Sequence, residues 1–330
     1  MQYLSIIKEA WDKALERLLL SNTIFATVKN DFGLDYELVS PENIKKISYN
    51  KPKPTTSLKS FFLPVKENVT SNISSGKQRI ILGVPNCDII GLRLLDEIYL
   101  DKDFNDIIYR ERRENTILIS SDCFSIQEHC HCLTNDVKPF STTDADLSVI
   151  QHNDLIFLRI ISSKGKEFAS QLSHLKPLDD QSALTDIEIE HMKIESLLIK
   201  SNKGLPDYKN TGKLLKKAGE GIWKKYSSKC VSCGACATIC PTCSCFLLID
   251  KTGFEKVKQL DACQYPGFER VAGGEDALFE THRRFRNRYM CKYVWKPEKF
   301  KPVACTGCGR CIEACIGKIN KNELFMELAT

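Results

Sequence analysis

The chain has 330 residues, 42% hydrophobic and 27% charged, and carries a formal net charge of +5. These values are ordinary for a soluble globular protein, and the length allows two domains. Charged residues throughout the first twenty positions argue against a signal peptide, and no apolar run is long enough to span a membrane. We therefore expect a cytoplasmic protein whose sixteen cysteines serve as metal ligands or redox groups rather than as disulfides.

Residues 1–205 are predicted to form an α+β or α/β domain, because short apolar runs alternate with stretches of helical periodicity. A proline- and threonine-rich sequence predicts a loop over 50–59. The spacing of apolar residues predicts three helices in this domain, over 3–20, 88–98 and 166–175. Buried strands are predicted where apolar residues run together, over 79–84, 116–120, 147–150 and 155–161.

A turn-rich sequence at 201–207 separates this domain from a mainly α-helical ferredoxin-type domain, residues 206–330. Apolar residues at helical spacing predict one helix over 214–226 and another over 275–289. The segment 241–304 lies between two cysteine runs and is much longer than the gap in a compact two-cluster ferredoxin. This extra length is the reason to expect a helical domain rather than a minimal ferredoxin.

Each cysteine run has the bacterial-ferredoxin spacing Cys-x2-Cys-x2-Cys-x3-Cys, which is typical of [4Fe–4S] ligands. In two-cluster ferredoxins the fourth cysteine of a run binds the other cluster. The spacing therefore predicts two [4Fe–4S] clusters with crossed ligand sets: Cys230, Cys233, Cys236 and Cys315 for cluster one, and Cys305, Cys308, Cys311 and Cys240 for cluster two. Two neighbouring clusters indicate electron transfer. Zinc is the competing interpretation, but zinc sites usually combine two Cys-x2-Cys pairs and have no use for a third cysteine at that spacing.

Four further cysteines lie in the predicted N-terminal domain: Cys87, Cys123, Cys130 and Cys132. The first two follow predicted strands, and the edge of one sheet can bring such residues together with the nearby pair. Four thiolates could hold a third [4Fe–4S] cluster or a structural zinc ion. Separate buried thiols are the alternative, and the spacing alone leaves these interpretations open.

The remaining cysteines and the basic residues between the two runs have structural interpretations. Cys243, Cys245, Cys263 and Cys291 are expected to pack near the clusters. The stretch 283–301 mixes Arg and Lys with aromatic residues, which is compatible with nucleic-acid binding. Because no nucleic-acid fold motif accompanies it, we favour a helix that covers the clusters and whose cations neutralise thiolate charge.

These motifs together resemble the 4Fe–4S dicluster family that includes the beta subunit of cytosolic [NiFe] sulfhydrogenase and an iron–sulfur subunit of anaerobic sulfite reductase. The matching segments cover nearly the whole chain: 61–64, 83–88, 109–113, 123, 130–132, 229–236, 240–246, 261–263, 272–274 and 305–311. The four N-terminal cysteines are the part most particular to this family, and they favour the third cluster. One departure is Ile316, which stands where proline would follow the last ligand.

The resemblance implies an electron-transfer subunit of a cytoplasmic oxidoreductase complex. Its partners would be a flavin- and NAD(P)H-binding subunit of the diaphorase type and a catalytic subunit of the hydrogenase or sulfite reductase type, with no nucleic acid and no membrane span. No catalytic residue is predicted. The alternative is a stand-alone reductase in which a cluster binds the substrate. All eight ferredoxin-type ligands are present, which argues against an open iron in the two predicted clusters.

Overall fold

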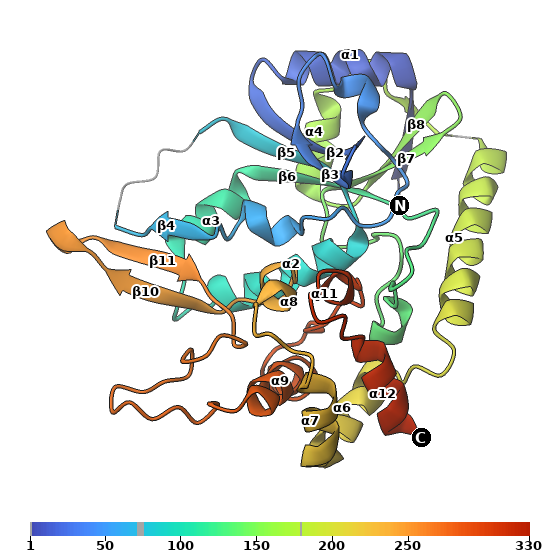
Figure 1. The fold of residues 1–330 in the computed structure, drawn as a ribbon. Coiled ribbons are helices and arrows are strands. Elements are labelled where there is room, and N and C mark those ends of the chain that lie inside the picture. Colours follow the sequence, from blue (N-terminus) through green and yellow to red (C-terminus); the bar gives the residue numbers. More distant parts are fainter. Residues whose placement is uncertain (1, 71–75, 179) are drawn as a thin grey trace.

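The computed structural model describes residues 2–70, 76–178 and 180–330. A large sheet with flanking helices forms the N-terminal part, and short helices joined by loops form the part that carries the two cysteine runs (Figure 1). The expected combination of an α/β region with a helical ferredoxin-type region is therefore confirmed.

The large sheet has eight strands in the order β3-β2-β5-β6-β7-β8-β1-β9. The central strands β2, β5, β6 and β7 run parallel to one another, and antiparallel strands complete both edges. The strands are β1 (Gln2–Ile7), β2 (Asn22–Asn30), β3 (Gly33–Leu38), β5 (Gln78–Val84), β6 (Thr116–Ser121), β7 (Leu147–His152), β8 (Leu155–Ile160) and β9 (Lys176–Pro177).

Helices cover both faces of the central strands, as the continuous apolar character of these strands requires. Alternate residues of a strand point to opposite faces. Ile80 and Leu82 of β5 accordingly pack with α1 and α4, whereas Ile81 between them packs with α2 and α3. The four helices are α1 (Lys8–Leu18), α2 (Asn86–Tyr99), α3 (Ile107–Glu114) and α4 (Ser163–Ser170).

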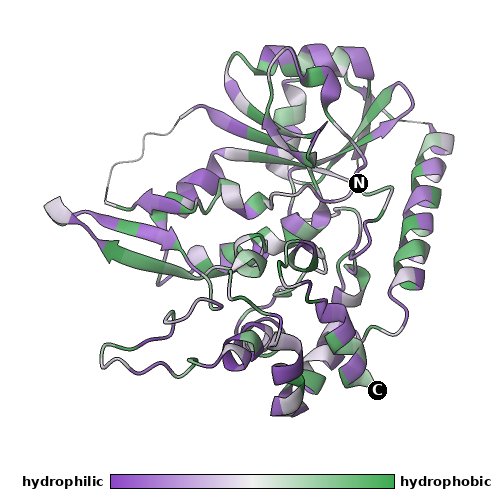
Figure 2. Ribbon diagram, in the orientation of Figure 1, coloured by the Kyte–Doolittle hydropathy of each residue, from purple (hydrophilic) through white to green (hydrophobic). Residues whose placement is uncertain are grey.

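The long helix α5 (Gln181–Ser201) leads from the sheet to the C-terminal part (Figure 1). Hydrophilic and hydrophobic residues alternate along it (Figure 2), and its buried residues Ala183, Ile187, Ile194 and Leu198 lie at helical spacing. The helices that follow are α6 (Tyr208–Lys217), α7 (Glu220–Ser227), α8 (Ala235–Thr238), α9 (Thr281–Met290), α10 (Lys296–Lys299), α11 (Arg310–Glu313) and α12 (Lys321–Ala329).

Shorter elements join these helices and strands. A π-helical turn, Cys291–Trp295, continues α9. Single 3-10 turns occupy Ile44–Lys46, Leu58–Phe61, Leu133–Asn135 and Thr252–Phe254. Trp223, Phe285, Tyr289 and Phe325 form the aromatic core of the C-terminal part. The ring centroids of Trp223 and Tyr289 are 5.9 Å apart, and those of Phe285 and Tyr289 are 4.9 Å apart.

The predicted strands and the helix over 88–98 are confirmed to within a few residues, but three other helix predictions need correction. Residues 2–7 form β1 rather than the start of a helix, because their backbone pairs with β8 along six positions. The helix predicted over 166–175 begins at Ser163, where Ser162 caps it by accepting a hydrogen bond from the Gly165 amide at 2.9 Å. The single helix predicted over 214–226 is divided into α6 and α7.

A second, three-stranded sheet joins the two parts of the chain. Strand β4 (Lys66–Asn68) from the N-terminal part pairs with β11 (Lys256–Leu260), which pairs in turn with β10 (Phe246–Asp250). The buried Lys258 ammonium is 2.7 Å from the carboxylates of both Glu67 and Asp106. The predicted boundary at 205/206 lies between α5 and α6, and this small sheet takes strands from both sides of it.

Candidate metal centres

Twelve of the sixteen cysteines border three cavities, which lie where the N-terminal sheet region meets the short C-terminal helices. All sixteen cysteines are free thiols. No group of three or more His, Cys, Asp or Glu side chains within residues 2–70, 76–178 and 180–330 is arranged to hold a single metal ion. Each set of thiols surrounds a cavity instead.

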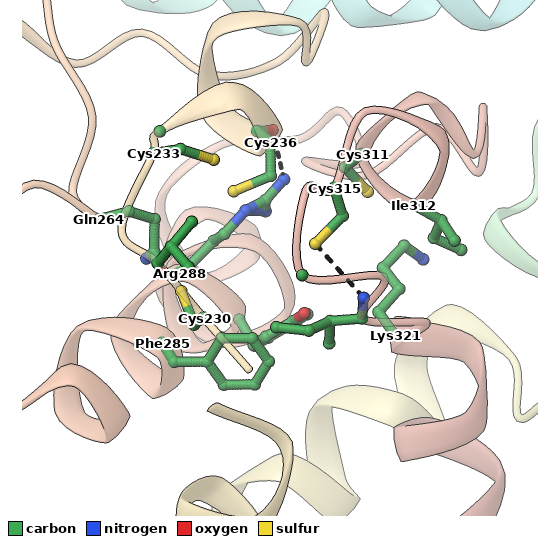
Figure 3. A pocket seen from close by; sticks show the side chains of 15 residues that line it. Cys230, Cys233, Cys236, Gln264, Phe285, Arg288, Cys311, Ile312, Cys315 and Lys321 are labelled. Atoms are coloured by element: carbon green, nitrogen blue, oxygen red, sulfur yellow. Dashed lines mark hydrogen bonds between the residues drawn. The ribbon is translucent and has the colours of Figure 1, made fainter. Parts of the chain in front are cut away.

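Cavity one is bordered by the first three cysteines of the first run and by the last cysteine of the second: Cys230, Cys233, Cys236 and Cys315 (Figure 3). The first three lie on the loop before α8 and on α8 itself, and Cys315 follows α11. The Ile319 amide lies 3.4 Å from the Cys315 sulfur. The Arg288 guanidinium reaches in from α9 and donates a 2.6 Å hydrogen bond to the Cys236 carbonyl. Cys311 also borders this cavity.

Cavity two contains the complementary set: Cys240, Cys305, Cys308 and Cys311. Lys292, on the π-helical turn, is buried beside Cys240, with its Nζ 3.1 Å from the sulfur. The same ammonium donates to the Thr242 hydroxyl at 2.7 Å and to the Ala304 carbonyl at 3.0 Å. The fourth cysteine of each run thus lies with the other run, in the arrangement that the crossed ligand sets predict. The identity of the ligands stays a prediction.

Cavity three brings together the four cysteines of the N-terminal part: Cys87, Cys123, Cys130 and Cys132. Cys87 lies on the first turn of α2 after β5, and Cys123 follows β6, so the carboxyl ends of two parallel strands position both thiols. Cys308 from the second run borders the same cavity. The Lys53 ammonium is 3.8 Å from the Cys130 sulfur and 2.8 Å from the Glu313 carboxylate.

The three cavities form a row, because Cys311 borders cavities one and two and Cys308 borders cavities two and three. Gly307 and Gly309 allow the second run to approach the loop that carries Cys130 and Cys132. Both have positive φ, and the His131 amide donates a 2.8 Å hydrogen bond to the Gly307 carbonyl. A Cβ on Gly309 would lie 2.5 Å from the His129 carbonyl oxygen, and one on Gly307 would lie 2.3 Å from the His131 carbonyl oxygen, so neither position has room for a side chain.

His131 lies inside the protein, although it stands between two candidate ligands. Its Nε2 is 2.7 Å from the Lys321 ammonium, and its Nδ1 is 2.8 Å from the His129 carbonyl. Burial, together with the charge of Lys321, holds the pKa of His131 well below its usual value. A neutral imidazole can accept the hydrogen bond from Lys321, which itself borders cavities one and two.

Burial controls the charge of the thiols. It raises the pKa of Cys132 and of Cys308 to about 12, and it raises the pKa of Cys87 and Cys123 well above their usual value. These thiols therefore stay protonated at neutral pH unless a metal takes the place of the proton. The donor sets have the composition that iron–sulfur clusters require, namely four cysteines to a site.

Buried cations provide a second test of whether the cavities fit such clusters. Arg288, Lys292 and Lys321 are all at least nine-tenths buried, and each borders at least one of cavities one and two. Their hydrogen bonds go to carbonyls, a hydroxyl, an amide, a sulfur and an imidazole, with no carboxylate partner in the part of the chain that the structure describes. Buried cations without anions are costly. A [4Fe–4S]2+ core with four thiolates, whose net charge is about −2, would supply the missing negative charge.

The comparisons with known proteins agree with these cavities. Residues 229–319 match the family model of the 4Fe-4S dicluster domain. The C-terminal part of the chain is a 4Fe–4S dicluster domain. The whole chain is also 27% identical over 341 residues to Sulfhydrogenase 2 subunit beta of Pyrococcus furiosus, an alignment that covers 99% of this chain and 98% of that protein. The family resemblance expected from the motifs is confirmed, and so are two [4Fe–4S] clusters as the content of this domain.

Sequence reasoning recognised part of this environment and missed another part. The basic stretch 283–301 was expected to cover the clusters, and Arg288 and Lys292 do border cavities one and two. The ion pair of Arg310 with Asp88 was not foreseen. Each partner adjoins a candidate ligand in sequence, Cys311 and Cys87 respectively, and that position next to a cysteine was the available signal.

Proposed function

We propose that this protein is the iron–sulfur electron-transfer subunit of a cytoplasmic oxidoreductase complex. The observation that carries the proposal is the row of three thiol-bordered cavities connected by Cys311 and Cys308. A [4Fe–4S] cluster supplies reversible one-electron chemistry, and clusters in a row can exchange electrons. Cluster one would be held by Cys230, Cys233, Cys236 and Cys315, cluster two by Cys305, Cys308, Cys311 and Cys240, and a third by Cys87, Cys123, Cys130 and Cys132.

The protein's own residues would set the properties of these sites. Arg288 and Lys292 place fixed positive charge beside the thiols, which favours the reduced, more negative state of a bound cluster. The surrounding apolar side chains exclude water and so strengthen the effect of each charge. None of the described cavities combines a clear substrate-binding group with an incomplete set of cysteines, which favours electron transfer over catalysis.

Cavity one offers a place for a redox partner to dock. Cys233 is exposed there, and the neighbouring Val231 and Ile316 are 63% and 66% exposed. We propose two partners, a flavin- and NAD(P)H-binding subunit of the diaphorase type and a catalytic subunit of the hydrogenase or sulfite reductase type. The full-length similarity to a sulfhydrogenase subunit supports this choice. Nucleic acid is not proposed as a partner, because Arg284, Arg288 and Lys292 of the basic stretch are buried. No helix among the described residues is long and apolar enough to cross a membrane.

A stand-alone reductase is the second candidate, and one experiment separates it from an electron carrier. The anaerobically purified chain would be reduced with dithionite until its cluster absorbance is bleached, freed of excess reductant, and then mixed with sulfite. We expect the absorbance to stay bleached until a catalytic partner is added. Rapid reoxidation by sulfite in the absence of any partner would contradict the proposal and support the stand-alone reductase.

The third cluster has its own test, which depends on iron content rather than on activity. Replacing Cys123 by serine is expected to lower iron and acid-labile sulfide by about four each per chain, because one cubane loses a ligand. The matched control is Ser125→Ala, which alters the border of the same cavity without touching a thiol. If both variants keep the wild-type iron content, the four N-terminal cysteines are structural thiols.

A further inference from the structure

Four cysteines outside the three cavities also lie together: Cys243, Cys245, Cys263 and Cys291. The Cys245 and Cys263 thiols are hydrogen-bonded to each other, and Cys243 and Cys291 are close enough to interact electrostatically with Cys245. The base of the β10–β11 hairpin brings the first two together. There the Asp261 amide donates a 3.0 Å hydrogen bond to the Cys245 carbonyl, two residues before Cys263.

Helix α9 fixes the position of Cys263 relative to Cys291. Gln264 and Arg284 exchange two hydrogen bonds, of 2.8 Å from the Gln264 amide to the Arg284 carbonyl and of 3.2 Å from the Arg284 guanidinium to the Gln264 carbonyl. Arg284, Arg288 and Cys291 follow at intervals of four and three residues, so they lie on the same face of the helix. The segment that carries Cys263 is therefore held against the helical face on which Cys291 lies.

Lys296 fixes Cys243 on the other side of the group. Its ammonium donates hydrogen bonds to the Thr242 carbonyl at 2.9 Å and to the Ser244 hydroxyl at 3.3 Å. These two residues flank Cys243, and Lys296 directly follows the π-helical turn that begins at Cys291. Turns of this kind are rare and frequently occur at functional sites. Three separate sets of contacts thus converge on the four thiols.

The charges around the group point to an anionic occupant. Lys59 is 4% exposed, and the only hydrogen bond of its ammonium within the described residues goes to the Ala237 carbonyl at 3.1 Å. Its nearest negative partners are the thiols of Cys243, Cys240 and Cys245. No carboxylate compensates this buried cation in the described chain, which resembles the situation of Lys292 in cavity two. Neutral thiols would leave the charge of Lys59 unbalanced, whereas metal-bound thiolates would balance it.

We propose that Cys243, Cys245, Cys263 and Cys291 hold a fourth iron–sulfur cluster beside cluster two. Four cysteines are the donor set of a [4Fe–4S] cluster. As in the three cavities, these thiols do not converge on one point as the ligands of a single ion would. The Cys243 thiol is hydrogen-bonded to Cys240, so a cluster here would adjoin the row of cavities and branch from it.

The test counts metal in the intact holoprotein. Iron, acid-labile sulfide and zinc would be assayed in wild type, in a Cys245→Ser/Cys263→Ser variant and in Cys291→Ser, all purified anaerobically. We expect each variant to lose about four irons and four sulfides per chain relative to wild type, with the electron paramagnetic resonance signals of the dicluster domain retained. The control Ser244→Ala changes the residue between two of the thiols and should keep the wild-type iron content.

Two results would overturn the fourth cluster. One is an unchanged iron content in both cysteine variants, and the other is zinc in wild type that disappears from them. Neither result touches the proposed electron-transfer function, which depends on the other twelve cysteines and is tested by reoxidation with sulfite. Because Cys291→Ser alters one side chain on a helix that is otherwise intact, it keeps the test decisive if the double variant does not fold.

Discussion

A Cys308→Ser variant is expected to lose at least ~100-fold in electron flow from the NAD(P)H-oxidising partner to the catalytic partner. Cys308 is the thiol that borders both cavity two and cavity three. Altering a residue that merely supports a metal ligand already costs about 10–100-fold in affinity or activity. A serine hydroxyl is a harder and less acidic donor than a thiol, and iron–sulfur clusters select soft thiolates. Loss of this ligand should therefore interrupt the row at its middle.

The N-terminal sheet region should stay folded in this variant. Its core, built around Ile80, Leu82 and Trp11, contains no residue of the second cysteine run. The matched control is Thr306→Ala, on the same loop, because the buried Thr306 hydroxyl has no hydrogen-bond partner among the described residues. Turnover of the reconstituted complex and far-ultraviolet circular dichroism would be measured for both variants. Normal turnover of Cys308→Ser would contradict a path through cavity two.

The features that could be predicted from the sequence are those that short-range patterns encode. The spacing within each cysteine run predicts that three thiols of one run meet one thiol of the other, and cavities one and two contain these sets. Buried strands such as β5 and β6 are continuous apolar runs and are recognisable for the same reason. In each case the residues that matter lie within a few positions of one another.

The features that were missed depend on distant partners. Residues 2–7 have helix-like apolar spacing, yet pairing with β8, whose residues 155–160 lie far along the chain, makes them a strand. The pairing of β4 with β11 likewise joins residues that no local pattern connects. Gly307 and Gly309 could be recognised as loop residues, but their close approach to the 129–132 loop follows only from the folded chain. Tertiary pairing overrides local propensity in all of these places.

The second prediction with a large expected effect concerns the ion pair that joins the two parts of the chain. Arg310 on α11 and Asp88 on α2 are both almost completely buried, and the guanidinium binds the carboxylate through two hydrogen bonds of 2.5 and 2.9 Å. Arg310 also donates to the Pro54 carbonyl at 2.9 Å, and Asp88 accepts from the Leu58 amide at 3.0 Å. Each partner adjoins a candidate ligand, so this pair holds cavities two and three in register.

Replacing Arg310 by methionine should lower the free energy of unfolding by about 3–5 kcal/mol, because it leaves the Asp88 carboxylate buried without a counter-charge. Arg310→Lys keeps the charge but cannot form the two-pronged contact, so it should lose less. Urea unfolding of the anaerobic holoprotein, followed by circular dichroism, gives these differences.

A double variant shows whether the loss comes from the unpaired charge. Asp88→Asn combined with Arg310→Met removes both charges and keeps an acceptor for the Leu58 amide, so it should be less destabilised than the sum of the two single variants. Additive losses would mean that the two side chains are not coupled. The expected coupling would identify the contact between α2 and α11 as the point where stability and the alignment of cavities two and three depend on the same two residues.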